Sequence, residues 1–99
     1  MERVTKKLVR ETFPNGIGAF FSPDRPVFDI VDLDVKDHEG KTYLGGWAYP
    51  NKDFVFDVSA PEETDHGWKV KTVEGKKVFI YPLSKQRGDR MTALVKEYY

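Results

Sequence analysis

Two Asp-His pairs are the first candidates in this chain for a metal site or for acid–base catalysis. The segments DHEG (37–40) and TDHG (64–67) each place an aspartate next to a histidine in a stretch typical of a turn. Imidazole and carboxylate groups bind zinc and transfer protons, and both turns would lie at the same end of an antiparallel sheet if two strands separate them. The spacing matches no established ligand motif, however, and solvated turns commonly use Asp, Glu and Gly. We therefore predict no catalytic residue, no metal and no cofactor, and keep a metal-dependent hydrolase at these loops as the most distant alternative.

A glycine pair, Gly16-Ile17-Gly18, could belong to a loop that binds phosphate. Such a loop needs a helix directly after it, because the helix N-terminus is directed at the anion. Two prolines follow within the next ten residues instead, and the loop contains no lysine. Pro14-Asn15-Gly16 fits a three-residue turn that ends on a glycine in the left-handed region. The glycines therefore predict a bend, and a hairpin built on this bend would pair Phe13 with Ile17.

The segment WKVKTVEGKKVFIYPL (68–83) is the strongest candidate for a binding surface. With Val73-Glu74-Gly75 as a three-residue loop, the glycine takes the left-handed position and the two faces of the hairpin separate. One face then carries the core residues Trp68, Val70, Val78 and Ile80. The opposite face carries three lysines and two aromatic residues: Lys69, Lys71, Lys77, Phe79 and Tyr81.

Two interpretations of this lysine-aromatic face stay open. Small β-domains use such faces to stack single-stranded bases and to neutralise phosphates. Alternatively, a C-terminal helix covers Phe79 and Tyr81 and leaves the lysines at the rim, because exposed aromatic pairs are uncommon without cover. We expect the covered arrangement, since an aromatic pair and an amphipathic helix can bury each other.

The rest of the chain consists mainly of short alternating segments between turn residues, which is typical of antiparallel β-structure. Segments 27–35 and 42–49 flank the DHEG turn, and closing this turn pairs Leu33 with Leu44. Both segments carry large apolar residues on both faces, so we expect a central hairpin in a sheet that is covered on both sides or curled on itself. Gly45-Gly46 are predicted to form the bulge or corner that such a curl needs.

The two ends of the chain differ in how clearly their patterns indicate a structure. Residues 2–11 fit neither period well, and are either the first strand of a hairpin, pairing Val9 with Phe21, or a first helix. In DRMTALVKEYY (89–99) apolar residues recur at helical spacing, and Asp89 can cap the start of the helix. The apolar stripe of this predicted amphipathic helix consists of Met91, Leu94, Val95 and Tyr98.

The composition limits the class of protein. The chain has 99 residues, of which 39% are hydrophobic and 14% aromatic, enough for a single domain over residues 1–99 with one core. We predict a mainly β fold, a small curled antiparallel sheet or partly open barrel of five to seven strands with one C-terminal helix. The fold is α+β if residues 2–11 are helical. There is no cysteine for a disulfide and no apolar run near the roughly 20 residues of a membrane helix, so we expect a cytoplasmic protein without a membrane partner.

The predicted function follows mainly from what the sequence lacks. The 16 basic and 16 acidic residues balance, so no net charge attracts nucleic acid. Because the chain has no catalytic signature, we predict a non-catalytic interaction module that binds a protein through an aromatic-rich sheet face or edge. The alternative is binding of single-stranded nucleic acid through hairpin 68–83. Under either hypothesis the oligomeric state stays open, and the predicted binding residues are Lys69, Lys71, Lys77, Phe79 and Tyr81.

Overall fold

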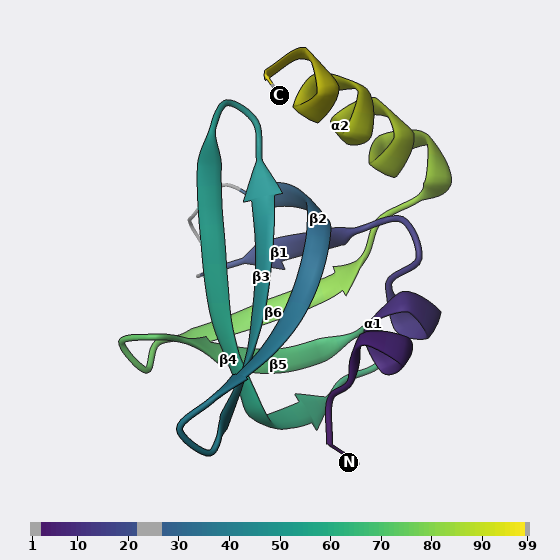
Figure 1. Ribbon diagram of the computed structural model, residues 1–99. Helices are drawn as coiled ribbons and strands as arrows, with labels where there is room; N and C mark the ends of the chain where they lie inside the picture. Colours follow the sequence, from purple (N-terminus) through teal and green to yellow (C-terminus); the bar gives the residue numbers. More distant parts are fainter. Residues whose placement is uncertain (1–2, 22–26, 99) are drawn as a thin grey trace.

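The computed structural model describes residues 3–21 and 27–98, which form a six-stranded barrel and two helices (Figure 1). The elements follow the chain in the order α1 (Lys6–Thr12), β1 (Ile17–Phe20), β2 (Val27–His38), β3 (Lys41–Ala48), β4 (Lys52–Glu63), β5 (Trp68–Thr72), β6 (Lys77–Pro82) and α2 (Lys85–Tyr98). The predicted mainly β fold, a curled antiparallel sheet with a C-terminal helix, is confirmed. Neither helix in this described part of the chain is long and apolar enough to cross a membrane.

The sheet is a closed barrel because β1 pairs with both β2 and β6, antiparallel in each case. Ile17 lies opposite Ile30 of β2 on one side and opposite Pro82 of β6 on the other. Closure pairs the backbone N–H and C=O groups that an edge strand would expose. Each of the six described strands therefore has a neighbour on both sides.

Alternate side chains of the strands fill the barrel interior. Six of them, none more than 1% exposed, are Ile17, Ile30, Leu44, Phe56, Val78 and Ile80. Burial of each such side chain contributes about 1.5–3 kcal/mol. Helix α1 lies against one end of the barrel (Figure 1) and adds Val9 to the same core, and Phe13, directly after the helix, packs there as well. The Phe13 ring meets Trp68 of β5 edge-on, with the ring centroids 4.8 Å apart.

The predicted first hairpin, which paired Phe13 with Ile17 and Val9 with Phe21, is wrong because residues 6–12 are helical. Thr5 caps this helix: its hydroxyl oxygen accepts a hydrogen bond from the Leu8 N–H at 3.1 Å. Val9 and Phe13, four residues apart, are both buried, which is the spacing of one helix face. The predicted bend is confirmed, since Gly16 has φ +105° and the strand β1 follows it in place of the helix that a phosphate loop requires.

The β2–β3 register differs by two residues from the predicted one. Val35, not Leu33, lies opposite Leu44, because only Glu39 and Gly40 form the turn and both adopt positive φ. This is the two-residue turn whose twist matches that of the strands, so β2 extends to His38. The bulge lies in β2 between Val31 and Asp34, not at Gly45-Gly46 on the opposing strand.

Gly46 nevertheless has a role in this irregular pairing. A Cβ at Gly46 would lie 2.4 Å from the Cγ2 of Ile30 and 3.2 Å from the Val31 carbonyl oxygen. A side chain there would collide with the bulged strand. The glycine therefore allows β3 to approach β2 closely at the point where the strand bends.

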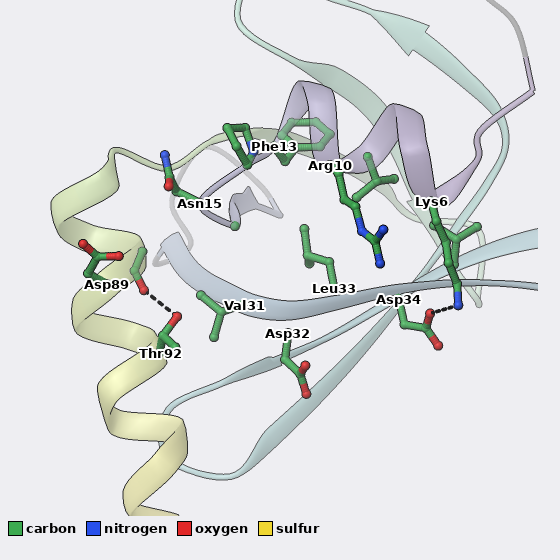
Figure 2. Close-up of a pocket in the computed structure, with 15 residues that line it drawn as sticks. Lys6, Arg10, Phe13, Asn15, Val31, Asp32, Leu33, Asp34, Asp89 and Thr92 are labelled. Carbon is green, nitrogen blue, oxygen red and sulfur yellow. Dashed lines mark hydrogen bonds and ion pairs between the residues drawn. The ribbon is translucent and has the colours of Figure 1, made fainter.

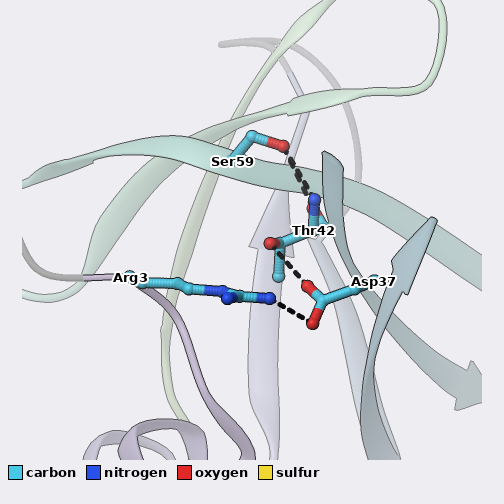
Figure 3. Close-up of polar contacts among 4 residues, drawn as sticks. All are labelled: Arg3, Asp37, Thr42 and Ser59. Carbon is cyan, nitrogen blue, oxygen red and sulfur yellow. Dashed lines mark hydrogen bonds and ion pairs between the residues drawn. The ribbon is translucent and has the colours of Figure 1, made fainter. Parts of the chain in front are cut away.

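A chain of polar contacts joins the N-terminal segment to β2, β3 and β4 (Figure 3). The Arg3 guanidinium donates to Asp37, and the Thr42 hydroxyl donates to the other oxygen of the same carboxylate at 2.8 Å. The Thr42 N–H donates to the Ser59 hydroxyl at 2.9 Å. Thr42 is buried, so these partners satisfy polar groups that water does not reach.

Asp57 makes the stability of this region sensitive to acid. Hydrogen bonds from Ser59, including its N–H at 2.9 Å, lower the pKa of Asp57, and the charges of Lys41 and Lys71 lower this pKa further. A carboxylate with a lowered folded-state pKa stabilises the fold above the unfolded-state pKa of about 3.9 and loses that contribution as the pH falls through the folded-state pKa.

We expect Asp57→Asn to destabilise the protein at neutral pH and to lose this difference progressively as the pH falls below about 3.9, the pKa of an unfolded aspartate. Urea unfolding over that range measures the free energy of unfolding of both proteins. Glu74→Gln, which removes an exposed carboxylate in the β5–β6 loop, is the control. A difference between Asp57→Asn and the unmodified protein that is constant with pH would contradict the prediction.

Helix α2 begins at Lys85, one turn before the predicted cap at Asp89. The Ser84 hydroxyl oxygen accepts a hydrogen bond from the Arg87 N–H at 3.2 Å, so Ser84 is the residue that caps the helix. Gly88 is buried against the turn after α1, where an added Cβ would lie 2.2 Å from the Asn15 carbonyl oxygen. This contact brings α2 beside β2 and β3, and the described apolar residues of its stripe, Met91, Leu94 and Val95, are half-buried.

Candidate binding surface

The β5–β6 hairpin has the predicted register. Val70 lies opposite Val78 and Lys71 opposite Lys77, so residues 73–75 form the loop. The Thr72 N–H donates to the Lys76 carbonyl oxygen at 2.8 Å, and Gly75 takes the predicted left-handed conformation with φ +91°. The predicted core face is confirmed by the burial of Trp68, Val70, Val78 and Ile80.

The predicted lysine-aromatic face therefore lies on the outside of the barrel. Phe79 is 43% exposed, because α2 extends along β2 and β3 and leaves the β5–β6 hairpin open. The expected cover of Phe79 by the C-terminal helix is wrong. Two contacts hold the first turn of α2 beside β2 and away from this hairpin: Gly88 packs on Asn15, and Arg87 pairs with Asp29.

Tyr81 packs against other parts of the protein, so only part of its side chain is accessible to a ligand. Its ring lies over Gly18 of β1, where an added Cβ would be 2.3 Å from the Tyr81 Cζ. The neighbouring Arg87 binds both oxygens of Asp29, at 2.6 and 3.0 Å, and this carboxylate raises the pKa of Arg87, with a smaller effect from Tyr81. The ion pair attaches the first turn of α2 to β2, and the nearby Tyr81 is half-buried.

Closure of the barrel adds residues to this surface that the sequence interpretation missed. Phe20 of β1 lies opposite Phe79 of β6, and the loop before β5 contributes His66. These side chains line a hollow of about 540 Å³ together with Tyr81 and parts of Thr64, Asp65 and Ile80. We call this surface the aromatic wall, defined by Phe20, His66, Lys69, Lys71, Lys77, Phe79 and Tyr81.

The lysines of the aromatic wall differ in how far their charges are compensated. Lys69 lies 3.5 Å from a Glu62 carboxylate oxygen, and its ammonium is 6.0 Å from the centre of the Phe79 ring. Lys71 lies opposite Asp57 on β4 and opposite Lys77 on β6. Like charges in direct opposition destabilise a sheet. Lys77 has no ion pair with any residue that the structure describes, so it is the cation most available to a ligand.

The histidines of the two Asp-His loops lie in different environments. His66 lines the hollow of the aromatic wall, whereas the His38 imidazole is 3.9 Å from the carboxylate of Glu39 in the β2–β3 turn. Within residues 3–21 and 27–98, no group of three or more His, Asp or Glu side chains is arranged to hold a metal ion. The geometry of the described residues therefore gives no support to the metal-dependent alternative.

Comparison of the chain with models of protein families, with curated proteins and with solved structures gave no match.

Proposed function

We propose that the protein is a small non-catalytic interaction module that binds another protein through the aromatic wall. The observation that carries this proposal is the exposed Phe79 ring beside a hollow of about 540 Å³. An apolar side chain of a partner can enter such a hollow and pack against the Phe79 ring. Burial of such side chains in well-packed pockets is typical of the residues that contribute most to interface affinity. The uncompensated Lys77 favours a partner segment that also carries a carboxylate.

The closed barrel narrows the proposed mode of binding from a sheet face or edge to a face. Addition of a partner strand requires unpaired N–H and C=O groups along an edge. Each described strand already has two neighbours. A partner would therefore bind to the side chains of the aromatic wall and not to the backbone of a strand.

The charge distribution favours a protein over single-stranded nucleic acid. Affinity for a nucleic acid depends largely on neutralising several phosphates at once. Two of the three lysines here lie near carboxylates, Lys69 near Glu62 and Lys71 opposite Asp57. Nucleic acid remains the alternative because lysines and an exposed aromatic ring share one face.

We expect Phe79→Ala to weaken binding of the partner by about tenfold, since truncating an interface aromatic residue commonly costs more than 1 kcal/mol. The free energy of unfolding should fall by only about 1–2 kcal/mol, because 43% of Phe79 is exposed and the substitution removes only its partial burial. Wild-type and variant proteins, each immobilised, are compared for the proteins they retain from a lysate of the source cell. A species retained by the wild type is then titrated against both.

The matched control is Val73→Ala, which shortens an exposed side chain at the tip of the same hairpin. Equal retention by Phe79→Ala and the wild type would contradict the role of the aromatic wall. A single-stranded oligonucleotide titrated at two salt concentrations tests the alternative. Binding that weakens steeply with salt would favour nucleic acid over a protein partner.

A further inference from the structure

A second hollow lies away from the aromatic wall, between α1, the bulged part of β2 and the start of α2 (Figure 2). Its volume is about 320 Å³, at the lower end of the range of small-ligand sites. Val9, Phe13 and Val31 are buried side chains in its walls, and Leu33 and Val35 are half-buried. The cleft can therefore receive a small apolar group.

Two cations line this cleft, and only one of them forms an ion pair. Lys6 lies 3.1 Å from Asp34, which lowers the pKa of that carboxyl, and Asp89 accepts a hydrogen bond from Lys85 at 2.7 Å. Arg10 has no hydrogen bond or ion pair with any residue in the described part of the chain. Figure 2 shows its guanidinium reaching from α1 into the space above β2, beside Leu33.

We propose that this cleft binds a ligand with one carboxylate and a small apolar body. The planar guanidinium of Arg10 can donate two parallel hydrogen bonds to a carboxylate. The apolar body would then contact Leu33 and the neighbouring wall of the cleft. The same chemistry is offered by a free carboxylic acid and by the C-terminal residue of a peptide.

The remaining carboxylates of the cleft define which anions it rejects. Asp32, Asp34 and Asp89 line the same space and repel every negative charge on a ligand, so the repulsion grows with each charge beyond the one carboxylate that Arg10 can bind. Phosphates and nucleotides are therefore disfavoured. None of the residues that define the aromatic wall lines this cleft, so the two binding hypotheses are independent.

N-acetyl-L-phenylalanine is a suitable probe, and N-acetyl-L-phenylalaninamide is the same molecule without the charge. We expect the acid to shift the backbone amide signals of residues 9–13 and 31–35 in a two-dimensional NMR titration. The amide and inorganic phosphate should bind at least about tenfold more weakly, because the amide lacks the carboxylate and phosphate lacks the apolar body. 3-Phenylpropanoate, which keeps the phenyl ring and the carboxylate but lacks the amide of a peptide, separates the two sources: affinity comparable to that of the N-acetyl amino acid indicates a free acid, and much weaker affinity indicates a peptide C-terminus.

Arg10→Gln tests the residue that carries the proposal, and Arg90→Gln, an exposed arginine of α2 outside the cleft lining, is its control. We expect Arg10→Gln to weaken binding of the acid about tenfold or more and Arg90→Gln to leave it unchanged. The NMR spectrum of each variant reports directly whether the fold is retained. The proposal is overturned if the acid causes no shifts at about 10 mM, if acid and amide bind equally, or if Arg10→Gln binds the acid as well as the wild type does.

Discussion

Replacing Trp68 with alanine is expected to lower the free energy of unfolding by about 3–5 kcal/mol, a large part of the stability of a domain of this size. Trp68 is 3% exposed and faces the barrel interior. Its ring also meets Phe13 edge-on at 4.8 Å, so the substitution removes the contact through which the segment after α1 packs on β5. The cavity left behind cannot be refilled by the neighbouring strands, because the closed sheet fixes their positions.

Urea unfolding of the two proteins, followed by far-UV circular dichroism, measures this loss. Val73→Ala serves as the control, since Val73 is 64% exposed in the loop of the same hairpin. That substitution should change the free energy of unfolding by no more than about 0.5 kcal/mol. A midpoint for Trp68→Ala close to that of the control would show that Trp68 is not part of the core.

Removal of residues 89–99 is expected to lower the free energy of unfolding by about 2–4 kcal/mol. The truncated chain loses Met91, Leu94 and Val95, each only half-buried, so each contributes roughly half of a fully buried side chain. It keeps Gly88 and the ion pair of Arg87 with Asp29, which attach the first turn of α2 to the barrel. The barrel should therefore still fold, with a lower unfolding midpoint.

The control for this truncation is the full-length double variant Arg90→Ala and Lys96→Ala, which changes only exposed side chains of α2. Its unfolding midpoint should stay close to that of the wild type. If the truncated chain unfolded at the wild-type midpoint, the apolar stripe of α2 would contribute nothing to the domain. That result would contradict the packing of α2 against β2 and β3.

Sequence patterns predicted only part of the candidate site. Lys69, Phe79 and their neighbours were predicted on one face, because strand alternation and a glycine turn are local properties of consecutive residues. Phe20 and His66 could not be added from the sequence. Phe20 reaches Phe79 only through the pairing of β1 with β6, which joins segments almost sixty residues apart.

Local sequence patterns were sufficient for the class of fold, the β5–β6 hairpin with its buried and exposed faces, and the amphipathic C-terminal helix. Each of these follows from hydrophobic period and turn chemistry within one short segment. The sequence patterns did not distinguish a strand from a helix for residues 2–11. A short helix with few apolar positions is stabilised mainly by its surroundings, here by the cap at Thr5 and by burial of Val9 against the barrel.

Which surfaces are covered depends on contacts between segments that are far apart in the sequence. Helix α2, held by the packing of Gly88 on Asn15 and by the ion pair of Arg87 with Asp29, lies along β2 and β3 and leaves Phe79 exposed. The same arrangement forms the cleft around Arg10, since its walls come from α1, β2 and α2. Both outcomes depend on steric fit between distant segments, which no local pattern of the sequence records.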